Sequence, residues 1–234
     1  VSPFDVATPV AAERTWDLLL AIAAGGAVVG AWKKSTFNGR TDVWEADVQP
    51  LALAGPFRQV YLNGKRLIWA RYPNEDERHP YSGGWAYVDG VRPPMYKDIE
   101  GERTDTVVLR AEDARPWSRP QEGEVCIFPR YNWWNRIEKI AAYDRSTRTI
   151  TLAKAMQYAA RPEDRFCVMG MREELDAPGE WYADVENQKL YLIPPAGADL
   201  TKDVVTVPTV NNILYFNKTR HNIKAGGRGA LLFR

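Results

Sequence analysis

Residues 57–70 read FRQVYLNGKRLIWA, and this stretch decides the fold class. Apolar and polar residues alternate over 57–62, and a second strand-like run covers 65–70. Asn63-Gly64 separates the two runs, and both residues of such a tight turn need positive φ, which Asn and Gly tolerate. The stretch therefore predicts two antiparallel strands joined by a two-residue turn.

Short strands separated by polar turns continue along most of the chain. Two further hairpins are predicted, over 137–143 with 149–152 and over 180–184 with 189–193. Single strands are predicted at 42–48 (an edge strand), 106–109, 124–128, 165–171 and 204–207. Strands that recur every ~8–12 residues are typical of an antiparallel β-sandwich or barrel, here with roughly 9 to 13 strands.

The two ends of the chain depart from this pattern. Residues 11–24 are rich in Ala, Leu, Glu and Arg and are followed by Gly25-Gly26, which predicts one N-terminal helix. Short strands at 212–216 and 221–225 resemble the rungs of a β-helix. We therefore expect three parts: a helical segment over 1–24, a β-sandwich or barrel over 25–207, and the start of β-helix-like rungs over 208–234.

A long irregular segment, residues 73–104, interrupts the strands and is called the arm below. Pro and Gly recur through it and break any regular element, and a loop of this length is often functional. Its aromatic side chains, including Tyr81 and Trp85, either line a groove or only pack the arm down. Arg71, just before the arm, either orients a ligand or holds the arm in place.

Composition excludes several classes of protein. The 234 residues carry 31 Lys+Arg and 30 Asp+Glu, a net charge of +1, which is too balanced for a polybasic nucleic-acid or membrane-surface binder. No apolar run approaches the ~18 residues of a membrane-spanning helix. With only two His, the chain lacks the ligands for a zinc site with Cys126 and Cys167. These cysteines are either buried apolar side chains or, in an exported protein, a disulfide between paired strands.

Aromatic residues point to a binding surface. The chain has 9 Trp and 11 Tyr, and Tyr131-Asn132-Trp133-Trp134-Asn135 gathers three rings and two amides. The apolar face of a sugar ring packs on an indole or phenol ring, while its hydroxyls bond to amide and guanidinium groups. In a strand, Trp133 and Trp134 would point to opposite faces, so one of them would meet a ligand or cover the arm. The predicted carbohydrate-binding residues are Arg71, Tyr81, Trp85, Arg130, Tyr131, Asn132, Trp133 and Trp134.

A catalytic alternative rests on paired carboxylates. Glycoside hydrolysis needs two of them on opposite sides of the sugar, and the densest acidic segment contains Glu173, Glu174, Asp176, Glu180 and Asp184. The same residues also suit turns, in which Asp caps backbone amides and Gly supplies unusual φ values. We favour the turn interpretation, and we expect no catalytic residue, metal or cofactor.

Taken together, several segments resemble the β-rich accessory domain of a bacterial family. The family comprises large, exported, right-handed parallel β-helix glycoside hydrolases, fucosidase-like and xylanase-like among them. The segments that carry the resemblance are 25–32, 43–48, 57–66, 70–74, 174–184 and 189–195. The family's extended β-helix, which is expected to carry its catalytic acids, does not follow Arg234, so we expect the accessory domain alone.

The resemblance implies a non-catalytic accessory or carbohydrate-binding domain of a secreted or periplasmic polysaccharide-degrading enzyme. Its implied partners are a polysaccharide or oligosaccharide and a neighbouring β-helix domain, with no nucleic acid and no membrane. Two alternatives remain open. One is a self-contained glycoside hydrolase or lyase that uses paired carboxylates, and the other is a purely structural module associated with a β-helix.

Overall fold

The computed structural model describes residues 26–51, 57–94, 97–130 and 132–209, and the backbone of 214–216 and 223–225. The predicted N-terminal helix lies outside these residues. The described part is mostly β, as predicted, and its helical elements are single 3-10 turns: η1 (Gln49–Leu51), η2 (Ala111–Asp113), η3 (Pro120–Glu122) and η4 (Arg172–Glu174). Among these residues, no helix has the length and apolar character needed to cross a bilayer.

The chain divides into two compact units, a division that the sequence pattern does not reveal. The second unit, Ala70–Ala177, is inserted between the two parts of the first unit, which end at Trp69 and resume at Pro178. The predicted arm and all the predicted carbohydrate-binding residues belong to the second unit.

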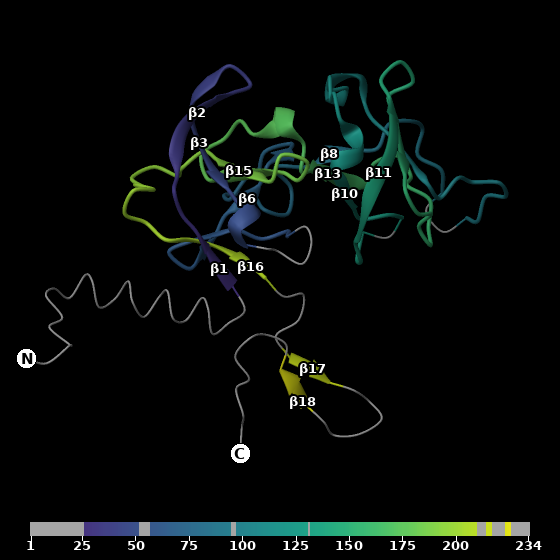
Figure 1. Cartoon of the computed structure of the whole chain (residues 1–234). Coiled ribbons are helices and arrows are strands. Elements are labelled where there is room, and N and C mark those ends of the chain that lie inside the picture. The colour runs from purple at the N-terminus through teal and green to yellow at the C-terminus, as the bar shows by residue number, and fades with distance from the viewer. Residues whose placement is uncertain are drawn as a thin grey trace, which may run out of the picture. The chain divides into compact units, whose positions relative to one another are not determined.

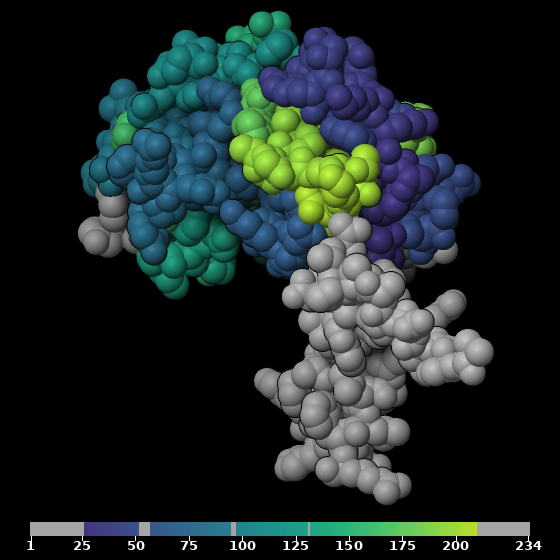
Figure 2. Space-filling model, turned by 90° about the vertical axis from the view of Figure 1, so that its left-hand side faces the viewer, coloured from purple at the N-terminus to yellow at the C-terminus, as the bar shows by residue number. Residues whose placement is uncertain are grey.

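The first unit contains two larger sheets, in addition to the pair formed by its last two described strands (Figure 1). One sheet has the order β1 (Gly26–Val29), β16 (Val205–Pro208), β4 (Tyr61–Leu62) and β5 (Lys65–Arg66). The other has the order β2 (Lys33–Phe37), β3 (Arg40–Asp47), β15 (Lys189–Leu192), β14 (Glu180–Asp184) and β6 (Ile68–Trp69). Figure 2 shows the purple N-terminal strands beside the yellow-green stretch that contains β16, in agreement with the antiparallel pairing of β1 and β16. The predicted edge strand at 42–48 is wrong, because β3 lies between β2 and β15.

Side chains from both sheets form one hydrophobic core in this unit, as in a β-sandwich. Trp181 on β14 is fully buried at its centre. Its ring stacks on Trp69 with centroids 5.5 Å apart and on Phe57 at 5.5 Å. Trp181 and Trp69 are opposite each other on neighbouring strands of one sheet, so their stacked indole rings form an aromatic part of this core.

The second unit is built on a single sheet of seven strands. Its order is β7 (Arg71–Tyr72), β13 (Arg165–Met169), β10 (Glu124–Ile127), β11 (Arg136–Asp144), β12 (Thr149–Leu152) and β9 (Thr106–Val108), with β8 (Ala86–Tyr87) also paired to β13. One face is apolar and fully buried, as Val125, Ile127, Phe166 and Val168 show. Since side chains alternate across a strand, the residues between these four face the other side.

The predicted hairpins are present. Asn63 and Gly64 have φ of 50° and 78°, which is the conformation that the turn requires. The hairpins of β11 with β12 and of β14 with β15 also form. Within its described residues, the arm is irregular except for β8.

The last two strands do not pair as rungs of a parallel β-helix would. β17 (Leu214–Phe216) and β18 (Ile223–Ala225) pair antiparallel with each other, whereas successive rungs of such a helix pair in parallel. The predicted boundary near 208 stays a prediction.

Substituting Gly64 tests the positive-φ turn. An added Cβ meets nothing within 4 Å at Gly64 or at Gly30, but only Gly64 has left-handed φ. Gly64→Ala should therefore lower the free energy of unfolding by about 1 kcal/mol, the cost of left-handed backbone for an L-residue. The measurement is urea unfolding of both variants.

Gly30→Ala is the matched control, and it should leave stability unchanged or raise it slightly through lower unfolded-state entropy. Equal losses in the two variants would contradict the assignment of the cost to φ.

Candidate functional site

The aromatic run predicted to bind carbohydrate lies in a bend, not in a strand. Residues 132–134 lie in the connection between β10, which ends at Ile127, and β11, which begins at Arg136. Arg130 and Asn132 have φ of 62° and 58°. This backbone breaks the alternation of a strand, so the prediction that Trp133 and Trp134 point to opposite faces is wrong. Tyr131 lies outside the described residues.

The two indoles instead lie side by side, and we call Trp133 and Trp134 the indole pair. Their ring centroids are 6.2 Å apart and their planes differ by 31°. Trp133 is 71% exposed, whereas Trp134 is half-buried and meets Tyr158 edge-on at 6.1 Å. The inner ring thus anchors the bend, and the outer ring is presented to solvent.

Polar groups lie beside the indole pair. Asn132 is exposed. The Trp134 Nε1–H is buried and has no hydrogen-bond partner among the described residues. The residue that precedes Trp133 in the chain therefore offers an amide open to solvent.

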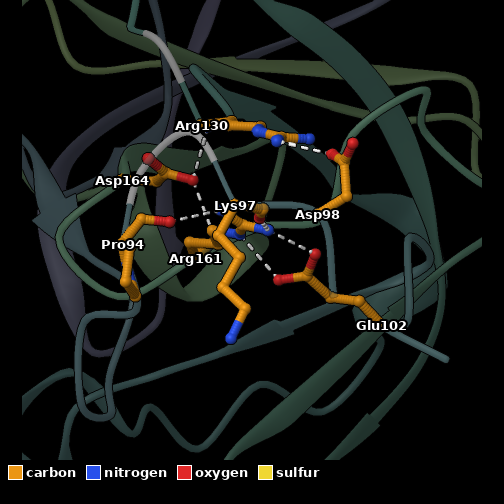
Figure 3. Close-up of polar contacts among 7 residues, drawn as sticks. All are labelled: Pro94, Lys97, Asp98, Glu102, Arg130, Arg161 and Asp164. Carbon is orange, nitrogen blue, oxygen red and sulfur yellow. Dashed lines mark hydrogen bonds and ion pairs between the residues drawn. The ribbon is translucent and has the colours of Figure 1, made fainter. Parts of the chain in front are cut away.

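Arg130 lies under the same bend and is already engaged. Its side chain is 10% exposed, and its guanidinium lies 5.6 Å from the Tyr158 ring centroid. One guanidinium nitrogen donates to Asp98 Oδ1 at 2.7 Å, and the Arg130 backbone N–H donates to Asp164 Oδ2 at 2.7 Å (Figure 3). Asp98 belongs to the arm and is 92% exposed. Arg130 therefore ties the arm to the bend that carries the indole pair.

Arg161 forms the centre of this network (Figure 3). Its side chain is 4% exposed, and it binds Glu102 of the arm through two hydrogen bonds of 2.7 and 2.8 Å. It also donates to the carbonyl oxygens of Pro94 at 3.2 Å and Lys97 at 2.7 Å. The hydrogen bonds from the Arg161 guanidinium hold the pKa of Glu102 below its ordinary value of 4.5. The Glu102 carboxylate therefore stays ionised and keeps its hydrogen bonds to Arg161.

Asp164 joins the two arginine-bearing loops through their backbones. Its Oδ2 accepts the N–H groups of Arg130 and Arg161 at 2.7 and 2.8 Å. Burial raises the pKa of Asp164 and outweighs the lowering by these two hydrogen bonds. Its contacts are those of a structural residue that fixes two loops beneath the indole pair.

The beginning of the arm is held by a second cluster. The guanidinium groups of Arg71 and Arg165 each lie 5.1 Å from the centroid of the Trp85 ring, and this ring meets Phe128 edge-on at 5.6 Å. Arg71 donates to the carbonyl oxygens of Pro73 and Gly84. These contacts hold the beginning of the arm in place, so Trp85 and Arg71 have a structural role there.

The predicted binding residues thus fall into two groups. Arg130, Asn132 and the indole pair share one bend. Arg71 and Trp85 contact each other at the start of the arm, where Arg165 also donates to the Tyr81 carbonyl oxygen at 2.8 Å. The Tyr81 ring is 83% exposed.

The network around the first group contains five residues that sequence reasoning missed: Asp98, Glu102, Tyr158, Arg161 and Asp164. They lie in irregular segments without periodicity, and their partners are up to 67 positions away in the chain. A Pro-flanked Arg gives no sign of burial, so no pattern in the sequence singles out Arg161.

Several acids of the catalytic alternative accept hydrogen bonds from other residues of the chain. Glu174 is 1% exposed and accepts hydrogen bonds from Arg115 at 3.1 Å and Trp117 Nε1 at 2.7 Å. Glu173 accepts from Ser118, and Asp184 accepts the Asn187 N–H at 3.0 Å as a turn cap. The turn interpretation of Asp184 is confirmed. Among the described residues, no three His, Cys, Asp or Glu side chains gather in a position to hold a metal ion.

Comparisons with known proteins give one fold-level likeness. No protein-family model matches the chain, and no curated protein matches it. A solved structure named "Glycoside hydrolase" is similar to it with a TM-score of 0.56 and 22% sequence identity. The match covers 80% of this chain but 31% of the solved chain. At this identity the likeness shows a shared fold.

Removing the charge of Glu102 tests the attachment of the arm. Glu102→Gln should lower the free energy of unfolding by roughly 2 kcal/mol at pH 7, because Arg161 loses a charged hydrogen-bond partner. Since the folded-state pKa of Glu102 is depressed, its contribution is full above the unfolded-state pKa and is lost as the pH falls through the folded-state value. The difference between the variant and the wild type, measured by urea unfolding, should therefore shrink in acid.

Glu100→Gln, an exposed change in the same segment, serves as the control and should have little effect. A loss at Glu102 that stays constant down to strongly acidic pH would show that the ion pair is not its source.

Proposed function

We propose that this chain is a non-catalytic carbohydrate-binding or accessory domain of an exported polysaccharide-degrading enzyme. The observation that carries the proposal is the 71% exposure of Trp133 beside the half-buried Trp134. An exposed indole on a fixed base is costly to leave in water and is suited to a flat apolar ligand.

The chemistry around Trp133 fits a saccharide. The apolar C–H face of a pyranose can lie on the Trp133 ring. Its hydroxyls can then bond to the exposed Asn132 amide, which offers both donors and an acceptor. Trp134, wedged against Tyr158, keeps the outer ring from collapsing inward. The arginines beneath are held by carboxylates, so the surface suits a neutral sugar better than an acidic one.

The fold likeness supports a place within a larger enzyme. The solved glycoside hydrolase is about three times as long as the region matched here. A domain of that kind would extend or shape the substrate cleft of a neighbouring β-helix domain, as the sequence resemblance implies. The secreted or periplasmic location and the polysaccharide partner belong to the same proposal.

Two alternatives make different demands. A self-contained hydrolase or lyase needs two carboxylates about 5 Å or about 6.5–9.5 Å apart across an open cleft. Within the acidic segment, Glu174 instead accepts hydrogen bonds from Arg115 and Trp117, and Glu173 accepts one from Ser118. A purely structural module would bind no sugar, which leaves the exposure of Trp133 without a purpose.

Trp133→Ala tests the stacking surface. The substitution should weaken binding to the best ligand of a neutral-glycan array about 10- to 100-fold, because burial of such a ring is worth roughly 1.5–3 kcal/mol. Trp133→Phe keeps a ring and should retain part of the affinity. The measurement is isothermal titration calorimetry with the array-selected oligosaccharide.

Val185→Ala, which shortens an exposed apolar residue of the first unit, should bind like the wild type. Release of reducing ends by the isolated chain would instead favour the hydrolase. Absence of both binding and release would leave the structural module.

A further inference from the structure

The two cysteines of the chain face each other across two strands. Cys126 on β10 is directly opposite Cys167 on β13 in antiparallel register. Both are free thiols, and they are 7% and 2% exposed. They lie on the face of the sheet away from the apolar core formed by Val125 and Val168.

The register brings the thiols within bonding reach. The Phe128 N–H donates to the Arg165 carbonyl oxygen at 3.0 Å, which marks a hydrogen-bonded pair. Pair types alternate along an antiparallel ladder, so Cys126 and Cys167, two residues further on, form another such pair. The Cα atoms of these pairs are about 5.5 Å apart. That separation is inside the range of about 4.4–6.8 Å found in disulfides, so a bond can form without separating the strands.

The environment distinguishes the two sulfurs. Asn135 Nδ2 donates to Cys126 Sγ at 3.8 Å. The hydrogen bond from the Cys167 thiol lowers the pKa of Cys126, and Arg71 and Arg165 act in the same direction. Donating that proton and being buried raise the pKa of Cys167. Cys126 is therefore the more acidic thiol of the pair, and it is also the more exposed one.

We propose that Cys126 and Cys167 are a modification site that closes to an intramolecular disulfide, with Cys126 as the attacking thiol and Cys167 as the resolving thiol. The oxidant is a small-molecule or protein disulfide. The Cys126 thiolate attacks one sulfur of that disulfide, forms a mixed disulfide and expels the other sulfur as a thiolate. Cys167 then loses its proton and attacks Cys126 Sγ, which expels the second thiolate. Two electrons pass from the cysteine pair to the oxidant, and the two protons leave with its two thiols.

The proposal is independent of sugar binding, because it needs only the paired strands. Closure would covalently join β10 to β13 and enclose residues 127–166, which include the indole pair. It would also convert Cys126 Sγ, which accepts the hydrogen bond from the Asn135 amide, from a thiol to a disulfide sulfur. Asn135 lies at the end of the bend that carries Trp133.

The test is a thiol count on the full chain. The folded protein is incubated with oxidised glutathione and denatured, and its remaining free thiols are labelled with a maleimide. The mass of the product is then measured by mass spectrometry. We expect loss of both titratable thiols and a mass lower by two hydrogen atoms, in a monomer. Two thiols that remain titratable, or a product joined between chains, would overturn the proposal.

Serine variants test the assigned roles. Cys167→Ser should stop at a mixed disulfide between Cys126 and glutathione, whereas Cys126→Ser should react far more slowly. Equal rates of adduct formation in the two variants would refute the division into attacking and resolving thiols. The wild-type count remains decisive if either variant fails to fold.

Discussion

A guanidinium taken out of water must find acceptors for its N–H groups, and this requirement organises the second unit. Arg161 is 4% exposed and binds Glu102 and the carbonyl oxygens of Pro94 and Lys97, all of them in the arm. Within its described residues the arm contains a single strand, β8, so these contacts and those of Arg71 and Arg165 fix its position. Through Asp164, the same network fixes the backbone of Arg130 and hence the bend that presents Trp133.

The seven-stranded sheet uses its two faces differently. Its apolar face is closed by aliphatic and aromatic side chains in the ordinary way. On the other face, Arg71 and Arg165 stack on Trp85, and the hydrogen bonds of their guanidinium groups run to carbonyl oxygens of the arm. An irregular segment leaves many carbonyl groups unpaired, and arginine can satisfy several of them while also covering an indole. This explains how a Pro- and Gly-rich arm can cover a sheet without a strand pattern.

Local signals predicted the parts of the fold that depend on neighbouring residues. The turn at Asn63-Gly64 was predictable because only a few residues accept positive φ, and both positions have it. The pairing of β6 with β14 was not predictable, because a strand of two residues is too short to show an alternation of apolar and polar side chains. At the site, the sequence analysis correctly predicted that one indole of Trp133 and Trp134 is exposed. It did so from a wrong premise, because these residues lie in a bend and not in a strand. The left-handed φ of Asn132 makes the bend, and Asn signals such a conformation only weakly.

The parallel pairing of β6 with β14 has a further consequence. The chain leaves the first unit after β6 and re-enters it just before β14, and the Ile68 N–H donates to the Gly179 carbonyl oxygen at 3.0 Å. The exit and the return therefore lie side by side in one ladder. A framework with adjoining attachment points of this kind can accommodate a change in the length or sequence of the inserted unit without a change in its own core.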